Sequence, residues 1–191
     1  MCLHVKRGRL CGQIPESMKF HAHPSAIVES RRVGARTRIW AFSHVQAEAM
    51  IGVECNVGEQ CFIENGAMVG DRVTIKNGVC IWRGIIVGDD VFIGPNATFT
   101  NDLRPRSPRS SFTGKKYQKE SWITPIIIET GCTIGANATI VGPVLLGRFC
   151  FVGAGSVVLR DVEEFELVAG NPCRRIGWVN EKGERVVRRP K

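Results

Sequence analysis

The chain has 191 residues, of which 43% are hydrophobic and 23% charged, an ordinary balance for a single globular domain. It contains no run of 18 apolar residues and no continuous apolar core near its start, so neither a membrane span nor a signal peptide is predicted, and we expect a cytoplasmic protein. The formal net charge of +8 suits a protein that handles anions, but no nucleic-acid-binding motif accompanies the basic residues, and neither nucleic acid nor a membrane is an expected partner.

A strict six-residue repeat follows residues 1–19, which are interpreted as an N-terminal extension, either disordered or upstream of the native start. Every sixth residue from 27 to 99 is apolar, and the repeat then resumes in a new phase at Ile128, Ile134, Ile140, Leu146, Val152 and Val158. A helix needs apolar spacings of three and four, and an independent strand alternates every two residues. The period of six instead predicts short strands wound into a solenoid.

The residue two positions before each apolar one is usually small or β-branched, which fits a cramped second inward position. Four of the eight cysteines occupy this slot: Cys55, Cys61, Cys132 and Cys150. A thiol in such a slot acts as a small buried hydrophobe. Because the chain has no Cys-x-x-Cys pair, no structural zinc site is predicted.

With 18 residues per coil, the corners of the solenoid fall into three columns. In one column the corner always begins with glycine, which permits the positive φ of a tight corner: Gly34, Gly52, Gly70 and Gly88. In the next, glycine alternates with Trp40 and Lys76. The third collects polar and aromatic residues: Glu64, Asn65, Trp82, Arg83, Asn101 and Asp102. We expect this third column, with His44 beside it, to line a polar cleft; the alternative is that its side chains simply face water.

An insertion after Asp102 is predicted to leave the solenoid as an extruded loop over residues 103–121. It contains six basic residues: Arg104, Arg106, Arg109, Lys115, Lys116 and Lys119. A structureless loop of this length is uncommon unless it is functional or disordered. It is interpreted either as a clamp for phosphates, across the cleft or on a neighbouring subunit, or as a mobile solvated loop.

The repeat ends near residue 160, and residues 161–191 are predicted to form a C-terminal cap with a turn at 180–183. Several segments are more specific than the periodicity: 38–40, 62–65, 75–78, 93–96, 99–107, 152–158 and 168–172. They resemble the nucleotide-sugar 3-N-acetyltransferases, a branch of the hexapeptide-repeat acyltransferases that acetylates dTDP-3-amino-3,6-dideoxyhexoses or UDP-3-amino-glucuronate. The resemblance implies an all-β, left-handed parallel β-helix of about six coils over residues 20–160, assembled as a homotrimer with active sites between neighbouring β-helices.

The resemblance also implies roles for individual residues. Asn77 and His44 are the candidate catalytic residues, although relatives often carry histidine where this chain has Ala41, and a packing role for His44 is the alternative. The amino sugar and its phosphates would be bound by Glu64, Asn65, Trp82, Arg83, Asn101, Asp102 and Arg104. Acetyl-CoA would be the co-substrate, with no metal, along Asn137, Ala138, Ala154, Gly155, Arg160 and Arg174.

The function expected from this resemblance is transfer of an acetyl group to the amino group, at C-3, of a nucleotide-linked amino sugar. The main alternative is O-acetylation of a sugar hydroxyl, which should require a histidine base for the harder nucleophile. A metal-dependent carbonic anhydrase of the same fold would need several histidines, and only His44 lies inside the repeat. A non-catalytic scaffold would need neither the broken third column nor the basic insertion.

Overall fold

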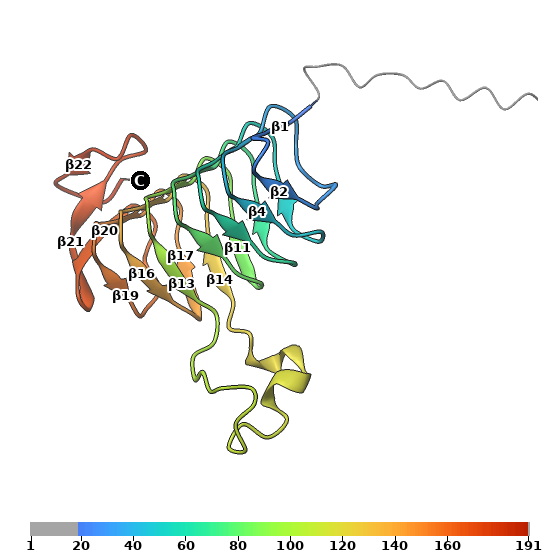
Figure 1. Ribbon diagram of the computed structural model, residues 1–191. Coiled ribbons are helices and arrows are strands. Elements are labelled where there is room, and N and C mark those ends of the chain that lie inside the picture. Colours follow the sequence, from blue (N-terminus) through green and yellow to red (C-terminus); the bar gives the residue numbers. More distant parts are fainter. Residues whose placement is uncertain (1–18, 191) are drawn as a thin grey trace, which may run out of the picture.

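The computed structural model describes residues 19–190, which wind into a parallel β-helix with a loop projecting from one edge (Figure 1). The predicted extension 1–19 therefore lies outside the described residues, except for Lys19. Among the described residues, no helix is long and apolar enough to cross a membrane. The predicted all-β solenoid, with its extruded loop and C-terminal cap, is confirmed.

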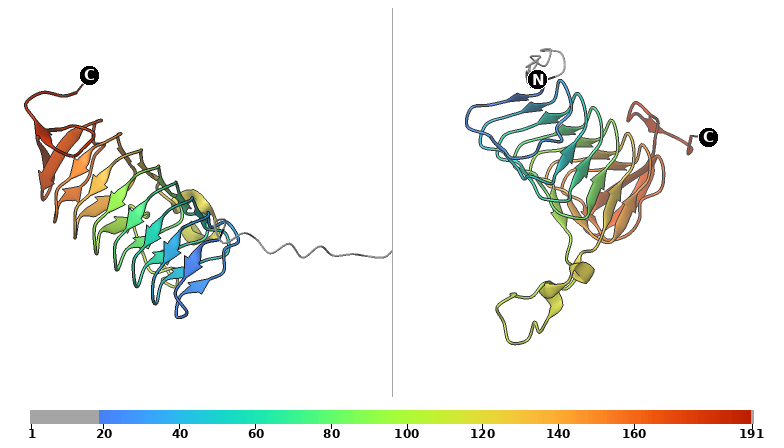
Figure 2. Two further views of the ribbon diagram at one scale, coloured as in Figure 1. Left: turned by 90° about the horizontal axis from the view of Figure 1, so that it is seen from above. Right: turned by 90° about the vertical axis from the view of Figure 1, so that its right-hand side faces the viewer.

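The coils have three flat faces, seen end-on and from above in Figure 2. The long face is one sheet with the strands β1 (His21–Ala22), β3 (Arg38–Ile39), β6 (Asn56–Val57), β9 (Thr74–Ile75), β12 (Phe92–Ile93), β15 (Thr133–Ile134), β18 (Phe151–Val152), β20 (Glu166–Gly170), β21 (Cys173–Val179) and β22 (Arg185–Val186). Strands β1 to β20 of this face are parallel. The stack is somewhat longer than six coils because β1 and β20 extend it beyond the hexads read from the sequence.

The other two faces follow in chain order around each coil. The split face consists of two sheets, one with β2 (Ile27–Val28), β4 (His44–Val45), β7 (Phe62–Ile63) and β10 (Cys80–Ile81), the other with β13 (Thr98–Thr100), β16 (Thr139–Val141) and β19 (Val157–Val158). The third face has β5 (Met50–Ile51), β8 (Met68–Val69), β11 (Ile85–Val87), β14 (Ile126–Ile128) and β17 (Val144–Leu146). We call the corner after each long-face strand corner 1, the corner after the split face corner 2, and the corner after the third face corner 3.

The six-residue repeat places its apolar side chains inside the prism. From Ile39 to Val158, the apolar residue that recurs once in each hexad is always buried. The first hexad is an exception. Ile27 is 57% exposed, and Val28 is the residue that pairs with the inward-facing Val45. The sequence phase was wrong there because the first coil is one residue shorter, so that Val28 and Val45 pair 17 positions apart instead of 18.

The small second slot is buried, as predicted for its four cysteines. Its side chains also supply hydrogen bonds between coils. The Thr37 hydroxyl donates to the carbonyl of Gly52 (2.7 Å), and the Cys61 thiol donates to that of Lys76 (3.3 Å). Burial raises the pKa of the Cys61 thiol, which keeps it protonated and inert.

The glycines at corner 3 are required for a reason other than the one expected. None of Gly34, Gly52, Gly70 and Gly88 has a positive φ. A Cβ on Gly70 would lie 2.8 Å from the carbonyl carbon of Gly88 in the next coil, so glycine allows the backbones to approach. The positive φ falls two residues later, on residues with side chains: Arg36, Glu54, Arg72 and Asp90.

The insertion does not disturb the stacking of coils. Phe92 pairs with Thr133 and Phe99 with Ile140, each 41 positions apart, so 23 residues are added to the ordinary 18 without a change of register. The added segment leaves after β13, returns at β14 and contains two short 3-10 helices, η2 (Lys116–Gln118) and η3 (Glu120–Trp122). It therefore has local structure and is not the structureless loop expected from its sequence.

The C-terminal end covers one end of the prism. Strand β20 continues the long face in parallel, and β21 and β22 then fold back as antiparallel strands. The predicted turn at 180–183 is confirmed by hydrogen bonds from the Gly183 N–H to the Asn180 carbonyl and from the Asn180 N–H to the Glu184 carbonyl.

Candidate active site

An aromatic row runs along the outer surface of the split face, next to corner 2. The ring of His44 meets that of Phe62 edge-on at 5.5 Å, and Phe62 meets Trp82 at 5.6 Å. Nε2 of His44 is buried without a hydrogen-bond partner and lies 3.6 Å from a carboxylate oxygen of Glu29. Sequence reasoning did not include Glu29, because it belongs to the first, shortened coil, where the repeat was out of phase.

Trp82 lies where the split face divides into its two sheets. Its indole N–H donates to the carbonyl of Phe99 at 2.9 Å. One coil earlier, the main-chain N–H of Glu64 makes the equivalent bond to the carbonyl of Ile81 at 2.9 Å. The indole thus replaces a rung of the backbone ladder, and its donor is not free for a substrate. Trp82 also packs partly against the apolar core.

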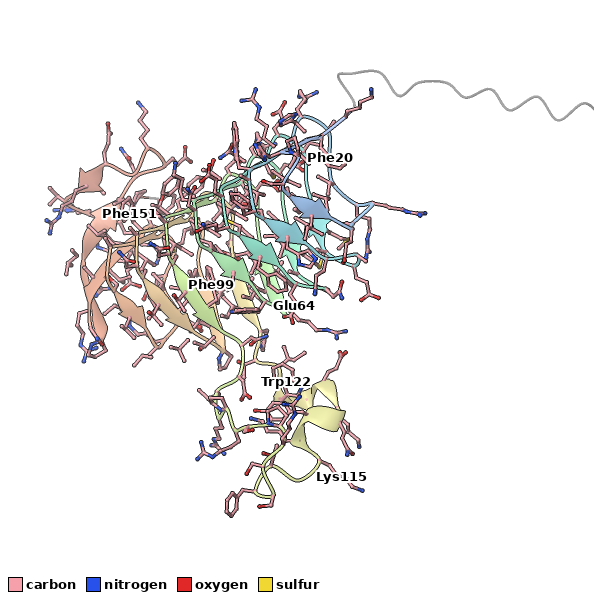
Figure 3. The ribbon with its side chains drawn as sticks, viewed as in Figure 1. Phe20, Glu64, Phe99, Lys115, Trp122 and Phe151 are labelled. Atoms are coloured by element: carbon pink, nitrogen blue, oxygen red, sulfur yellow. The ribbon has the colours of Figure 1, made fainter. Side chains whose placement is uncertain are left out.

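The polar residues of corner 2 bind one another from coil to coil. A Glu64 carboxylate oxygen accepts from the Arg83 N–H (2.8 Å), and the Asn101 amide donates to the Arg83 carbonyl (2.9 Å). The Asn65 side-chain oxygen accepts from the Glu48 N–H (2.8 Å). Glu64 lies at the edge from which the loop projects (Figure 3). The structure therefore brings Glu64, Asn65, Arg83 and Asn101 together in one polar row, as the columns predicted.

The loop is tied to this row at two points. The Arg83 guanidinium forms an ion pair with Glu120 in η3 (2.6 Å). Asp102 accepts two hydrogen bonds from the Lys116 ammonium (2.7 and 2.8 Å) and one from the Tyr117 hydroxyl (2.7 Å). Burial opposes ionisation of Asp102, but these hydrogen bonds outweigh it and keep its pKa below the ordinary value. Asp102 thus anchors the loop, and the Lys116 ammonium is occupied by this contact rather than free to bind a ligand.

We call the contact of Asp102 with Lys116 and Tyr117 the clasp. The other basic side chains of the loop face solvent. The backbone N–H of Arg104 donates to Asp102 (2.9 Å), while the Arg104 side chain is exposed. The remaining basic residues of the insertion are exposed as well: Arg106, Arg109, Lys115 and Lys119. Tyr117 was overlooked as a structural residue, although its being the only tyrosine in the chain was a usable signal.

Asn77 does not lie in this row. It is exposed at corner 1, on the opposite edge of the split face from Glu64 and Arg83. Its side-chain oxygen lies 3.3 Å from the Glu59 N–H one coil earlier. Asn137 and Gly155 occupy the same corner in later coils, and both have a positive φ. Asn77 thus shares its edge with predicted cofactor-binding positions rather than with the predicted sugar-binding ones.

Three other predicted cofactor residues are placed differently from one another. Ala154 is exposed at corner 1 beside Gly155, as expected for a lining residue. Ala138 is 0% exposed and belongs to the core, so its side chain is not accessible to a ligand; the sequence could not distinguish the outward Asn137 from its inward neighbour. Arg174 is exposed on β21, where its guanidinium donates to the carbonyl of Cys173 (3.1 Å).

Arg160 is a structural partner rather than a free cation. It follows β19 and therefore lies in the column of corner 2, away from Asn137 and Gly155. Its guanidinium binds the buried carboxylate of Glu166 (2.8 Å). Burial opposes ionisation of Glu166, but Arg160 and the Glu163 N–H outweigh it and lower its pKa. No group of three or more His, Cys, Asp or Glu that could hold a metal occurs among residues 19–190.

Comparisons with known proteins agree with this architecture. The pattern described as "Hexapeptide repeat of succinyl-transferase" matches residues 49–83, 84–100 and 125–160. A dTDP-3-amino-3,6-dideoxy-alpha-D-galactopyranose 3-N-acetyltransferase from Aneurinibacillus thermoaerophilus is 47% identical over 157 residues, which cover 82% of this chain and 77% of that protein. The chain belongs to the hexapeptide-repeat acyltransferases. Within them it groups with the nucleotide-sugar N-acetyltransferases.

The chain is also similar to other acyltransferases. A putative acetyltransferase, YJL218W, from Saccharomyces cerevisiae is 33% identical over 49% of this chain and 45% of that protein. Among solved structures, AntD, an N-acyltransferase from Bacillus cereus in complex with dTDP and 3-hydroxybutyryl-CoA, has a TM-score of 0.55 at 18% identity and covers 85% of this chain and 81% of its own. The acetyltransferase domain of PglB from Neisseria gonorrhoeae has a TM-score of 0.50 at 20% identity, over 84% and 58%. These two show the fold.

Proposed function

We propose that this protein transfers an acetyl group from acetyl-CoA to the amino group at C-3 of a nucleotide-linked amino sugar, in the cytoplasm. The observation that carries the proposal is the 47% identity, over 77% of its length, to an enzyme that acetylates the 3-amino group of a dTDP-linked hexose. AntD, which shares the fold, was solved with dTDP and an acyl-CoA, the two ligand classes that this reaction needs.

The reaction requires little more than positioning and charge stabilisation. The lone pair of the neutral amine attacks the thioester carbonyl carbon, the C–S bond then breaks, and the amine proton leaves as the CoA thiolate departs. Holding amine and thioester in near-attack geometry supplies on the order of 7–11 kcal/mol in favourable cases. Asn77, exposed at corner 1, is the side chain that we assign to orient the amine.

His44 is the described histidine beside corner 2, where its ring also packs edge-on against Phe62. Its Nε2 has no hydrogen-bond partner and lies 3.6 Å from a carboxylate oxygen of Glu29. We assign His44 to accept the proton that the amine loses. The two catalytic candidates nevertheless lie on different parts of the split face, since His44 precedes corner 2 in β4 and Asn77 belongs to corner 1.

This separation supports a homotrimer whose active sites are shared between chains. Asn77 and the small residues of corner 1 lie on one edge of the split face, and Glu64, Arg83 and Asn101 lie on the other. An edge of one chain facing the opposite edge of a neighbour would combine them. The third face carries a continuous row of outward apolar side chains that suits such contacts: Met50, Met68, Ile86, Ile127 and Leu145.

Corner 1 of the later coils suits the pantetheine arm of acetyl-CoA. Its outward residues there are small or bear an amide: Asn137, Ala154 and Gly155. A Cβ added at Gly155 would meet no atom within 4 Å, so this corner is open. Arg174 is the described cation that we assign to the CoA phosphates, whereas Arg160 would contribute only by holding Glu166.

A substrate panel tests the function. Purified protein is incubated with acetyl-CoA and dTDP- or UDP-linked 3-amino and 4-amino sugars, and product mass and free CoA thiol are measured. We expect acetylation of a 3-amino sugar, and Asn77→Ala should lower kcat by about 10²-fold or more with an unchanged thermal midpoint, because positioning is lost. Acetylation of hydroxyl acceptors alone would overturn the proposal.

A further inference from the structure

Two aromatic side chains at corner 1 of the second coil are exposed without a role in the sites described above. Trp40 is 36% exposed and Phe42 is 69% exposed. The Trp40 ring is held in place because its indole N–H donates to the side-chain oxygen of Asn56 in the next coil (2.8 Å). An oriented aromatic ring at the surface is a stacking surface rather than part of a core.

The backbone of Phe42 is unusual for an exposed aromatic residue. Its φ is +59°, a conformation that a residue with a Cβ seldom adopts. Phe149 has the same conformation at corner 3, but its ring stacks on Phe165 at 5.3 Å and is thus supported by packing. At Phe42 the neighbouring coil fixes the main chain instead, since the Phe42 N–H donates to the Ser25 hydroxyl (3.3 Å), which lies 2.8 Å from Nδ1 of His23.

The pair lies on the same corner as Asn77, two coils away. Two coil rises correspond to about 10 Å, a span that a ribose and a diphosphate bridge. An exposed cation lies at each end of this stretch, Arg38 on β3 beside the pair and Lys76 next to Asn77, while the coil between them carries the exposed Glu59. Toward the C-terminal end, the outward residues of the same corner are small or carry an amide, as at Asn137 and Gly155. Along its length corner 1 thus presents the aromatic pair first, then Glu59 and Lys76, and then small residues.

We infer that Trp40 and Phe42 form the binding surface for the pyrimidine base of the nucleotide sugar, with Arg38 and Lys76 beside its diphosphate. The inference rests on the proposed function and adds its nucleotide subsite. The base stacks on the aromatic rings, the amino sugar reaches Asn77, and acetyl-CoA approaches along the corner from the later coils. Base stacking on aromatic side chains tolerates different bases, so these rings give affinity for the nucleotide rather than a choice between thymine and uracil.

The test measures nucleotide binding apart from catalysis. Isothermal titration with dTDP, UDP and acetyl-CoA is carried out on the wild type, Trp40→Ala, Phe42→Ala and the conservative Trp40→Phe. The matched control is Phe92→Ala, because Phe92 is an equally exposed aromatic on the long face, outside corner 1. Both alanine variants should weaken dTDP or UDP binding by at least about fivefold, the lower end of the effect of losing one base-stacking ring. Trp40→Phe and Phe92→Ala should retain affinity, and acetyl-CoA binding should not change.

The outcomes separate the subsite from the function. If both alanine variants bind dTDP and UDP as the wild type does, the subsite is wrong while the acetyltransferase assignment stands. If their sedimentation changes and all ligands bind more weakly in proportion, the rings belong to a subunit contact and the inference is overturned. If the wild type binds acetyl-CoA but neither nucleotide, and acetylates only amines without a nucleotide, the proposed function and the subsite both fail.

Discussion

The ammonium of Lys116 lies 2.7 and 2.8 Å from the two carboxylate oxygens of Asp102, fourteen residues earlier in the chain. The same ammonium donates to the Arg104 carbonyl at 2.6 Å, and Tyr117 donates to Asp102 at 2.7 Å. This contact closes the base of the loop, which projects away from the β-helix and contains Lys115 and Trp122 (Figure 3). A segment that composition alone would describe as a basic, solvated loop therefore has a fixed entry and exit.

Removing the ammonium should open the loop without affecting the β-helix. We expect Lys116→Met to be cut by trypsin within residues 104–119 about tenfold faster than the wild type, because local opening becomes easier. Lys115→Met is the matched control, since it removes a neighbouring tryptic site and an exposed charge but no contact with Asp102. Equal cleavage of the two variants would show that the clasp does not order the loop. The thermal midpoint of the β-helix should be the same in both.

The clasp should also resist mild changes of pH. The folded loop lowers the pKa of Asp102 below 3.8 and raises that of Lys116 above 10.5, in each case because the hydrogen bonds between them outweigh burial. The stability that Asp102 contributes is complete above its unfolded pKa and is lost as pH falls through the lower folded pKa. The stability that Lys116 contributes is complete below its unfolded pKa and is lost as pH rises through the higher folded pKa. Fluorescence of Trp122, which packs edge-on against Tyr117 at 5.4 Å, should be flat from about pH 5 to about pH 9.

A transition of that fluorescence near pH 6 or 7 would contradict this prediction. The signal is isolated by subtracting the spectrum of Trp122→Phe, because Trp40, Trp82 and Trp178 also contribute.

Measurements of stability can distinguish the two possible reasons for a corner glycine, which are close approach of neighbouring backbones and a positive φ. In Gly52→Ala the new Cβ would lie 2.5 Å from the carbonyl oxygen of Gly70, and backbone cannot yield as a side chain can. We expect the free energy of unfolding to fall by about 1–3 kcal/mol or more. Gln60→Gly, at a corner position with φ +56°, should change stability by no more than about 1 kcal/mol, because relief of the strained backbone offsets the added chain entropy. Equal destabilisation of both variants in urea unfolding would refute this explanation.

The C-terminal cap depends on a buried carboxylate. Glu166 is almost fully buried and binds Arg160 at 2.8 Å and the Glu163 N–H at 2.8 Å. Glu166→Gln should lower the free energy of unfolding by about 1–3 kcal/mol, because a charged hydrogen bond is lost in a buried site. The control Glu164→Gln loses only an exposed contact with Arg189 at 3.6 Å and should cost less than about 1 kcal/mol. Thermal unfolding followed by circular dichroism compares them.

Much of the fold could be predicted because a period of six repeated over many coils leaves few alternatives. The recurring apolar residues from Ile39 to Val158 point inward as expected, since a shift of the register by one residue would expose all of them. The prediction failed at Ile27, where the coil is one residue short, and for the corner glycines, whose steric role depends on the next coil. Neither feature is visible within one hexad, because each depends on a neighbour about 18 residues away.

The candidate site was predictable as columns but not as contacts. Sorting by coil placed Glu64, Asn65, Arg83 and Asn101 at one corner. Hydrogen bonds join Glu64 and Asn101 to Arg83, whereas Asn65 accepts from the Glu48 N–H. It could not reveal that the Trp82 indole bonds to the Phe99 carbonyl or that Arg160 neutralises Glu166, because a side chain's partner is decided by rotamer and burial. The family resemblance assigned Asn77 and Glu64 to one site, although they lie on opposite edges of the split face.

The unchanged register on both sides of the insertion has an evolutionary consequence. Because Phe92 and Thr133 meet as any two residues one coil apart do, a corner can take up or lose chain length at little cost to the stack. Loops of different length and charge can then replace one another at this corner, while each coil remains stabilised by its neighbours. A loop transplanted from a relative between positions 102 and 124 should therefore leave the thermal midpoint of the β-helix unchanged.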